Sequence, residues 1–398
     1  MTKKTWSMIT VLVIALFLLT ACGGQADEGS DIATTISLWH SMKDSEIAAM
    51  TGTIIPAFQE KYPNVQVELL FTPDNDLRGK FETAVSTGEG PDILVGHDDW
   101  GPAFYDALLA ADVSDVLADY GDNINAAAVA EGTYAGVQVG VPYSLKGVVM
   151  YRNTDIMPEA ATDVADLLTK AAAANSGDVY GFVGETGPFF AMGHLHKTGD
   201  LMTPEGDPKF NSAAGVAWME MLKSFDTVGP TSQDDDNDVN LFKQGKAGVI
   251  IDGAWNIGAF TDLGDVVVID PWPEGMSGFV QSSYIFLNAN VTGDQATAAK
   301  AFMGFLLTTE AQAAFYEADP AFIPANSQVE VTDPLRQQAM AAFDGGVGFV
   351  TIPEMGAYWG PVGNAILAVR VDNADIQATL DSAFQAVTDS VAEIRAGQ

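Results

Sequence analysis

A tryptophan at the end of an apolar run is the residue whose placement most suggests ligand chemistry. Residues 247–251 are rich in β-branched side chains, which favours a buried strand, and Asp252-Gly253-Ala254-Trp255 follows. A large indole beside two small residues, at the carboxyl end of a strand, leaves room for a molecule against the ring. The apolar indole face and its N–H suit a sugar, which has an apolar ring face and a rim of hydroxyls. The alternative is a core tryptophan packed under a loop.

Two other segments place polar or aromatic side chains at similar positions. Asp98 and Asp99 follow a predicted strand over 92–95, and their carboxylates could accept hydrogen bonds from sugar hydroxyls. The alternative is a solvated pair that begins the next helix. Tyr358 and Trp359 stand between small residues near the end of the chain. We therefore expect both segments to face a ligand.

The elements that must position these side chains alternate in type. Strands are predicted over 34–39, 65–71 and 92–95, with apolar residues at helical spacing between them, although Pro56 should kink or shorten the first helix. This alternation is typical of an α/β fold with a parallel sheet. Further along, the pattern predicts strands at 266–269 and 279–287 and one long helix over 297–318. A chain of 398 residues exceeds what one core usually supports, so we expect two lobes.

The first 22 residues have the layout of a signal peptide. Lys3 and Lys4 precede an apolar run over 9–19, and Cys22 follows a small residue at its end. This end resembles the lipobox of bacterial lipoproteins; a plain signal peptide or an N-terminal membrane anchor is the alternative, although the run is short for a span. We expect lipidation of Cys22, a flexible tether over 23–33, and a lipid-anchored position outside the cytoplasm on the bacterial cell membrane.

Composition excludes several functional classes. Hydrophobic residues make up 47% of the chain, which supports real cores. The formal net charge of −35 argues strongly against nucleic acid as a partner, and it fits a soluble, acidic extracellular surface. Cys22 is the only cysteine, so once it is modified no thiol is left for a disulfide, a nucleophile or a metal site.

One acidic segment invites a metal assignment. Residues 233–238 place aspartates at alternating positions, as calcium loops do. Val239 stands where such a loop needs glycine, and no glutamate lies at the ligand distance downstream. We interpret the segment as an acidic loop that caps the following helix, and we expect neither a metal nor a cofactor.

Five segments form a set in their order and spacing. They are the lipobox at Cys22, IIPAFQEKYPNV at 54–65, TGEGPDI at 87–93, GKAGVIIDGAW at 245–255 and the Tyr358-Trp359 pair. Together they resemble the maltose/maltodextrin-binding protein family, the family 1 extracellular solute-binding proteins of bacterial ABC importers. The resemblance covers essentially the whole mature chain. It implies a two-lobed, periplasmic-binding-protein-like fold, with a ligand cleft between the lobes and a hinge of crossing strands.

The resemblance also implies where the lobes divide. The crossings match residues near 143–148, 282–287 and 328–335, so each lobe is discontinuous in sequence. We expect one lobe from residues 34–145 and 285–330, and the other from 146–284 and 331–398.

The family's ligand positions carry over unevenly. Its stacking tryptophans correspond to Trp255 and Trp359, with Tyr358 beside the second, and its stacking tyrosine corresponds to Phe189. Its first-lobe aspartate is Asp98, but its next residue, an arginine, is Asp99 here. Its crossover glutamate is Lys146, an upstream tryptophan is Val95, and its first-loop acid falls near Lys43 or Asp44. The resemblance thus implies a ligand-binding set of Asp44, Asp98, Asp99, Lys146, Phe189, Trp255, Tyr358 and Trp359.

These observations favour a monomeric binding protein without catalytic activity. The resemblance implies capture of a small carbohydrate, an oligosaccharide such as a maltodextrin-like sugar, and its delivery to ABC permease subunits in the membrane. A secreted glycoside hydrolase needs two carboxylates across one glycosidic bond, and no glutamate stands at an aromatic-rich strand end to serve as the acid. A third reading keeps the fold and binds a polyamine, an amino acid or a metal, because an acidic cleft favours a cation.

Overall fold

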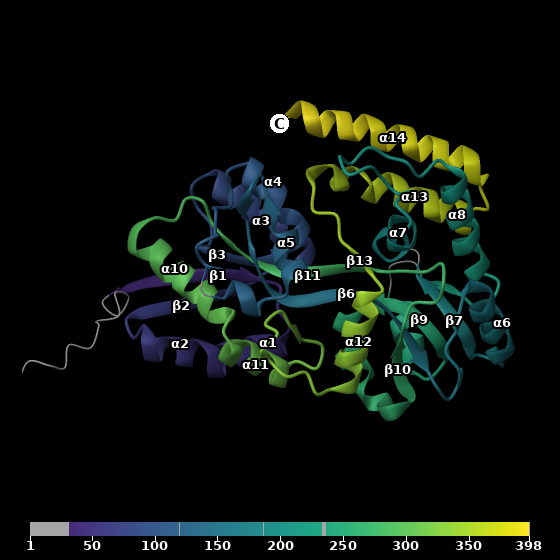
Figure 1. The fold of residues 1–398 in the computed structure, drawn as a ribbon, viewed down its shortest axis with the longest axis horizontal. Helices are drawn as coiled ribbons and strands as arrows, with labels where there is room; N and C mark the ends of the chain where they lie inside the picture. The colour runs from purple at the N-terminus through teal and green to yellow at the C-terminus, as the bar shows by residue number, and fades with distance from the viewer. Residues whose placement is uncertain (1–31, 119, 186, 233–235, 398) are drawn as a thin grey trace, which may run out of the picture.

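The chain forms two α/β lobes that lie side by side and are joined by long strands (Figure 1). This computed structural model describes residues 32–118, 120–185, 187–232 and 236–397. Cys22, the predicted signal peptide and most of the tether lie outside the described residues, as do residues 233–235 of the acidic segment. Within the described part, no helix is long and apolar enough to cross a membrane.

The first lobe is built on the strand–helix alternation that the sequence predicted. Its parallel strands stand in the order β2-β1-β3. Their bounds are β1 Thr34–His40, β2 Val65–Phe71 and β3 Ile93–His97. The helices of this lobe are α1 Asp44–Ala49, α2 Ile55–Lys61, α3 Asp74–Ser86, α4 Gly101–Asp106, α5 Ala126–Glu131, α10 Gly293–Leu306 and α11 Thr309–Ala318, with the small hairpin β4 Thr133–Tyr134 and β5 Val137–Gln138.

Two expected helices are each divided, for physical reasons. A π-helical turn at Met50–Ile54 separates α1 from α2, and Pro56 stands in the first turn of α2, where its missing N–H costs nothing. The predicted helix over 297–318 is two helices. The side chain of Thr308 accepts a hydrogen bond from the backbone of Ala311 and so caps the start of α11.

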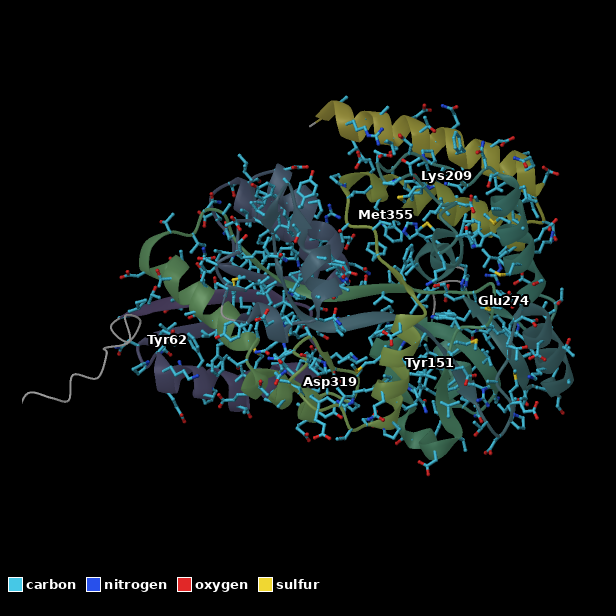
Figure 2. The ribbon with its side chains drawn as sticks, viewed as in Figure 1. Tyr62, Tyr151, Lys209, Glu274, Asp319 and Met355 are labelled. Atoms are coloured by element: carbon cyan, nitrogen blue, oxygen red, sulfur yellow. The ribbon has the colours of Figure 1, made fainter. Side chains whose placement is uncertain are left out.

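The second lobe continues the sheet in the order β6-β9-β7-β8, with β10 also paired to β6. These strands are β7 Tyr180–Glu185, β8 Thr231–Ser232, β9 Ala247–Gly253 and β10 Val267–Asp270. Its helices are α6 Val164–Ala174, α7 Pro188–His196, α8 Ala213–Phe225, α9 Asn237–Lys243, α12 Pro334–Asp344, α13 Trp359–Arg370 and α14 Ile376–Gly397. Tyr151 lies in the core of this lobe (Figure 2) and donates a hydrogen bond to the carbonyl of Gly253 at 2.9 Å.

Two long strands run between the lobes. β6 spans Val141–Asn153; its first half pairs with β11 and its second half with β9 and β10. β11 spans Phe279–Leu287 and pairs at its start with β13 (Val347–Gly348) and at its end with β3. The predicted crossings near 143–148 and 282–287 fall within these strands. The segment near 328–335 contains no strand. It leads directly into α12.

Candidate ligand-binding cleft

Partly exposed aromatic rings from three segments of the second lobe gather beside the crossing strands. Trp255 follows β9, Phe189 lies in the first turn of α7, and Trp359 begins α13. The ring centre of Phe189 lies 6.1 Å from that of Trp255 and 6.4 Å from that of Trp359. Trp359 also stacks on Phe349 at 5.8 Å. The structure therefore brings together the three rings that the sequence singled out as stacking residues.

Gly253 determines where the Trp255 ring lies. A Cβ built on Gly253 would overlap the indole of Trp255, so only glycine lets the ring fold back over the strand end. The sequence suggested that the small neighbours make room for a ligand. The structure shows that Gly253 first makes room for the indole itself.

A pocket of about 360 Å³ lies between the first lobe, the crossing strands and Trp255. Its wall in the first lobe comes from the loop after β1, the start of α3 and the end of β3. Its floor carries Lys146 of β6 and Gln281 of β11, and Trp255 closes the side that faces the second lobe. Polar groups thus meet an aromatic ring in one hollow, as in small-molecule sites.

Asp74 and His97 form a hydrogen-bonded pair in this wall. The Nε2 atom of His97 lies 3.0 Å from Oδ1 of Asp74, and the hydroxyl of Ser41 donates to the same oxygen at 2.8 Å. The hydrogen bond with His97 is the largest cause that lowers the pKa of Asp74, to about 2. Asp74 is therefore an ionised acceptor at neutral pH. Sequence reasoning missed both residues, although both stand where a strand end meets a helix start.

Lys43 contacts both lobes. Its Nζ donates to the backbone carbonyl of Trp255 at 2.6 Å and lies 3.9 Å from Oδ2 of Asp319. Figure 2 shows Asp319 near the junction of the lobes. Burial lowers the pKa of Lys43, and the charges of Asp319 and Glu46 oppose this. Of the two first-loop residues that the resemblance pointed to, Lys43 lines the pocket, whereas Asp44 is exposed at the start of α1 and does not.

The aspartates after β3 do not line the pocket. Asp98 is 1% exposed, and its carboxylate accepts hydrogen bonds from the backbone N–H groups of Ser282 (3.1 Å) and Asp99 (2.9 Å). Asp99 is partly buried outside the pocket lining. The reason is local, because the chain enters a 3-10 turn at Asp98–Trp100 directly after β3. That turn leaves His97 facing the pocket instead.

Tyr358 is a core residue, which corrects its assignment as a ligand contact. Its ring is fully buried and packs edge-on against Phe210, with ring centres 6.0 Å apart. Its hydroxyl donates to the carbonyl of Gly206 at 2.8 Å. Trp359 begins α13, so neighbouring side chains point in different directions, and only Trp359 joins the rings beside the cleft.

Glu131 makes the stability of the folded protein depend on pH. The side chain lies at the end of α5, where the hydroxyl of Ser282 approaches its Oε2 atom at 3.5 Å, and burial raises its pKa from 4.5 to about 7. The folded state therefore holds this proton more tightly than the unfolded state, and the free energy of unfolding falls as pH rises from about 4.5 to about 7.

We expect Glu131→Gln to flatten this part of the stability profile, measured as urea midpoints at pH 5, 6, 7 and 8. A slope equal to that of the unmodified protein would contradict the assignment.

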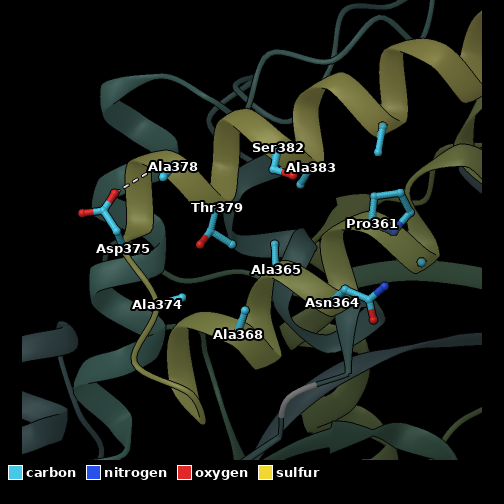
Figure 3. Close-up of a pocket in the computed structure, with 12 residues that line it drawn as sticks. Pro361, Asn364, Ala365, Ala368, Ala374, Asp375, Ala378, Thr379, Ser382 and Ala383 are labelled. Carbon is cyan, nitrogen blue, oxygen red and sulfur yellow. Dashed lines mark hydrogen bonds between the residues drawn. The ribbon is translucent and has the colours of Figure 1, made fainter.

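A larger hollow of about 670 Å³ lies between α13 and α14 (Figure 3), and neither Trp255, Phe189 nor Trp359 lines it. Its lining is mostly alanine, glycine and small polar residues, with no aromatic ring. Its one charged lining residue, Asp375, is already engaged, because it accepts the backbone N–H of Ala378 at 2.9 Å and so caps α14. The groove therefore lacks the chemistry of a ligand site.

Comparisons with known proteins agree in family and fold. The model of the bacterial extracellular solute-binding protein family matches residues 53–342. A maltotriose-binding protein of Pyrococcus abyssi is 24% identical over 87% of this chain and 80% of its own length. A maltooligosaccharide ABC transporter solute-binding lipoprotein of Streptococcus pneumoniae is 24% identical over 98% of this chain and 97% of its own. The Thermus thermophilus maltotriose-binding protein bound with maltotriose superimposes with a TM-score of 0.78 at 22% identity, covering 89% of this chain and all of that one.

Proposed function

This chain belongs to the bacterial extracellular solute-binding proteins, and we propose that it captures a small oligosaccharide between its two lobes for an ABC importer. Members of this family bind solutes and do not transform them, so the hydrolase alternative is set aside. The similarity to proteins named for maltotriose and maltooligosaccharides supports a sugar rather than a polyamine.

The observation that carries the proposal is the meeting of stacked rings and polar groups at one cleft. Trp255 lines the pocket, and Phe189 and Trp359 extend the ring cluster beyond it, so together they would take the apolar sides of sugar rings. Asp74 in the first-lobe wall and Lys146 in the floor would bind the hydroxyls. A sugar needs both kinds of contact, and a metal or an amino acid does not need three large rings.

The crossing strands form a hinge that connects sugar binding to delivery. β6 and β11 connect the lobes, so a rotation about them would open and close the cleft. The bond from Lys43 to the carbonyl of Trp255 is a contact that an opening rotation would break. We propose that a bound sugar favours the closed arrangement and that permease subunits recognise it.

A thermal-shift screen tests the sugar assignment. Purified protein is heated with maltose, maltotriose, maltotetraose, a galactooligosaccharide and spermidine, each at millimolar concentration. We expect the melting temperature to rise with at least one oligosaccharide, because a ligand that binds only the folded state stabilises it. Spermidine should give no shift. A shift with spermidine and none with any sugar would contradict the proposal.

We also propose that Cys22 anchors the mature protein to the outer face of the cell membrane. The support is the sequence before Cys22 and the similarity to a protein named as a lipoprotein. In membrane fractionation of expressing cells, we expect Cys22→Ser to shift the protein to the soluble fraction or to leave its signal peptide uncleaved. A variant that stays in the membrane fraction with its signal peptide cleaved at the same site would contradict the anchor.

A further inference from the structure

The floor of the pocket carries a lysine and a glutamine on facing strands. Lys146 of β6 is the direct register partner of Gln281 of β11. Residues opposite each other in an antiparallel pair put their side chains on the same face, within about 5.5 Å at Cβ. Both side chains line the pocket. Because these are the crossing strands, the pair sits at the hinge end of the cleft.

Neither side chain of this pair is engaged within the protein. Across the described residues, no hydrogen bond or ion pair reaches the Nζ of Lys146 or the side-chain amide of Gln281. Gln281 is only 6% exposed as a whole residue, and its side chain lines the pocket. A polar side chain that lines a pocket without a protein partner is available to a ligand.

The other ionisable side chains of the lining all have hydrogen-bond or ion-pair partners. Asp74 is held by His97 and Ser41. Glu46 accepts hydrogen bonds from the backbone N–H of Lys43 at 3.0 Å and from the hydroxyl of Tyr143 at 3.2 Å. The ammonium of Lys43 has Asp319 beside it. Among the charged groups that line this pocket, Lys146 is the one that no hydrogen bond or ion pair of the described residues reaches, although its charge contributes to the lowered pKa of Asp74.

Lys43, the second lysine of the pocket, also favours an anionic ligand. The charge of Lys146 is one of the causes that lower the pKa of Lys43, so the two ammonium groups repel each other across the pocket. An anion between them would relieve that repulsion.

We propose that this floor binds a carboxylate, so that the preferred ligand is an oligosaccharide with a uronic acid ring at the hinge end of the cleft. The inference rests on the proposed function, since it assigns a class of sugar to the same site. Lys146 supplies the charge and Gln281 donates a second hydrogen bond through its amide nitrogen. A hydroxyl could accept the same bonds, but a carboxylate accepts charge-assisted bonds, which are about twice as strong as neutral ones. One carboxylate on a short sugar differs from the polyanions that the net charge disfavours.

Matched sugar pairs test the inference by isothermal titration calorimetry. The probes are maltotriose beside maltotriose with one ring oxidised to glucuronate, and galactobiose beside digalacturonate. We expect the acidic member of at least one pair to bind at least tenfold tighter than its neutral partner. Lys146→Met should bring that ratio to about one or below, and Lys146→Arg should keep it. Gln281→Leu should reduce it.

Lys80→Met is the matched control, because it also removes one positive charge, but the Lys80 side chain is 54% exposed, lies 3.8 Å from Asp76 and does not line the pocket. This variant should keep the same ratio of affinities for the acidic and the neutral sugar as the unmodified protein. Neutral members that bind as tightly as acidic ones, or a preference that survives Lys146→Met, would overturn the inference and leave the proposed function intact. Absence of binding by all four sugars would count against both.

Discussion

Replacement of Trp255 by alanine should lower the affinity for the best-bound oligosaccharide more than tenfold and leave the free energy of unfolding nearly unchanged. The indole closes one side of the pocket and is partly exposed. A ring that stacks on a ligand in a desolvated pocket is worth about 2 kcal/mol or more, and about 1.4 kcal/mol is a factor of ten in affinity. A core tryptophan would instead cost roughly 3–5 kcal/mol of stability. Calorimetric titration and a urea melt on the same sample separate these outcomes.

Tyr358→Phe is the matched control for this experiment. It removes one hydroxyl from a fully buried ring and with it the bond to the carbonyl of Gly206. We expect a loss of about 1 kcal/mol in stability and unchanged affinity. If Trp255→Ala binds sugar normally at normal stability, the stacking role is wrong. A large loss of stability of Trp255→Ala in the urea melt would show that Trp255 is a core residue.

Replacement of Arg152 by methionine should lower the free energy of unfolding by about 3–5 kcal/mol. The guanidinium makes two bonds to Asp270, at 2.6 and 3.0 Å, and one of its nitrogens also donates to the carbonyls of Met157 and Pro158. Both charged side chains are less than a tenth exposed. Methionine fills a similar volume but leaves the carboxylate of Asp270 buried without a partner, which accounts for most of the loss. Equilibrium urea unfolding followed by circular dichroism measures it.

Two further variants show whether the buried pair is the cause. Arg78→Met breaks the exposed pair with Glu82, in which both side chains are 40% exposed, and should cost less than about 1 kcal/mol. Arg152→Met combined with Asp270→Leu should recover much of the loss, because no unpaired charge then stays buried. Equal effects of Arg152→Met and Arg78→Met would contradict the account.

The α/β fold could be predicted because its signals are local. The strand β2 has the predicted bounds, β1 ends one residue later than predicted, and β3 is shifted by one to two residues. Pro56 marked the division of the first helix. The break before α11 was missed because apolar residues continue at helical spacing through Thr308, whose capping bond only the structure displays. The exact lobe boundaries stay predictions, since the crossing strands belong to both halves of the sheet.

The site was harder to predict because it depends on contacts between distant segments. Lys43 meets the carbonyl of Trp255 across 212 positions of sequence, and no local pattern encodes that meeting. Adjacent residues also take opposite roles: Tyr358 is core and Trp359 joins the ring cluster. Which of two neighbours faces the cleft depends on the turn that carries them.

The residues that sequence reasoning missed share one feature. Asp74, His97 and Gln281 line the pocket, yet none is itself an aromatic ring or one of the paired acids that stood out, although His97 directly precedes Asp98 and Asp99. His97 and Asp74 lie at or just after the carboxyl ends of β3 and β2, so the rule that singled out Asp98 could have found them. Gln281 carried no such signal, because its importance comes from its register with Lys146.

A crystal structure of the protein with its tightest-binding oligosaccharide tests the central claim most directly. The account predicts one sugar chain between the lobes, with a ring face against Trp255 and polar contacts to Asp74, Lys146 or Gln281. Density for the sugar in the groove between α13 and α14, or anywhere out of contact with Trp255, would contradict it.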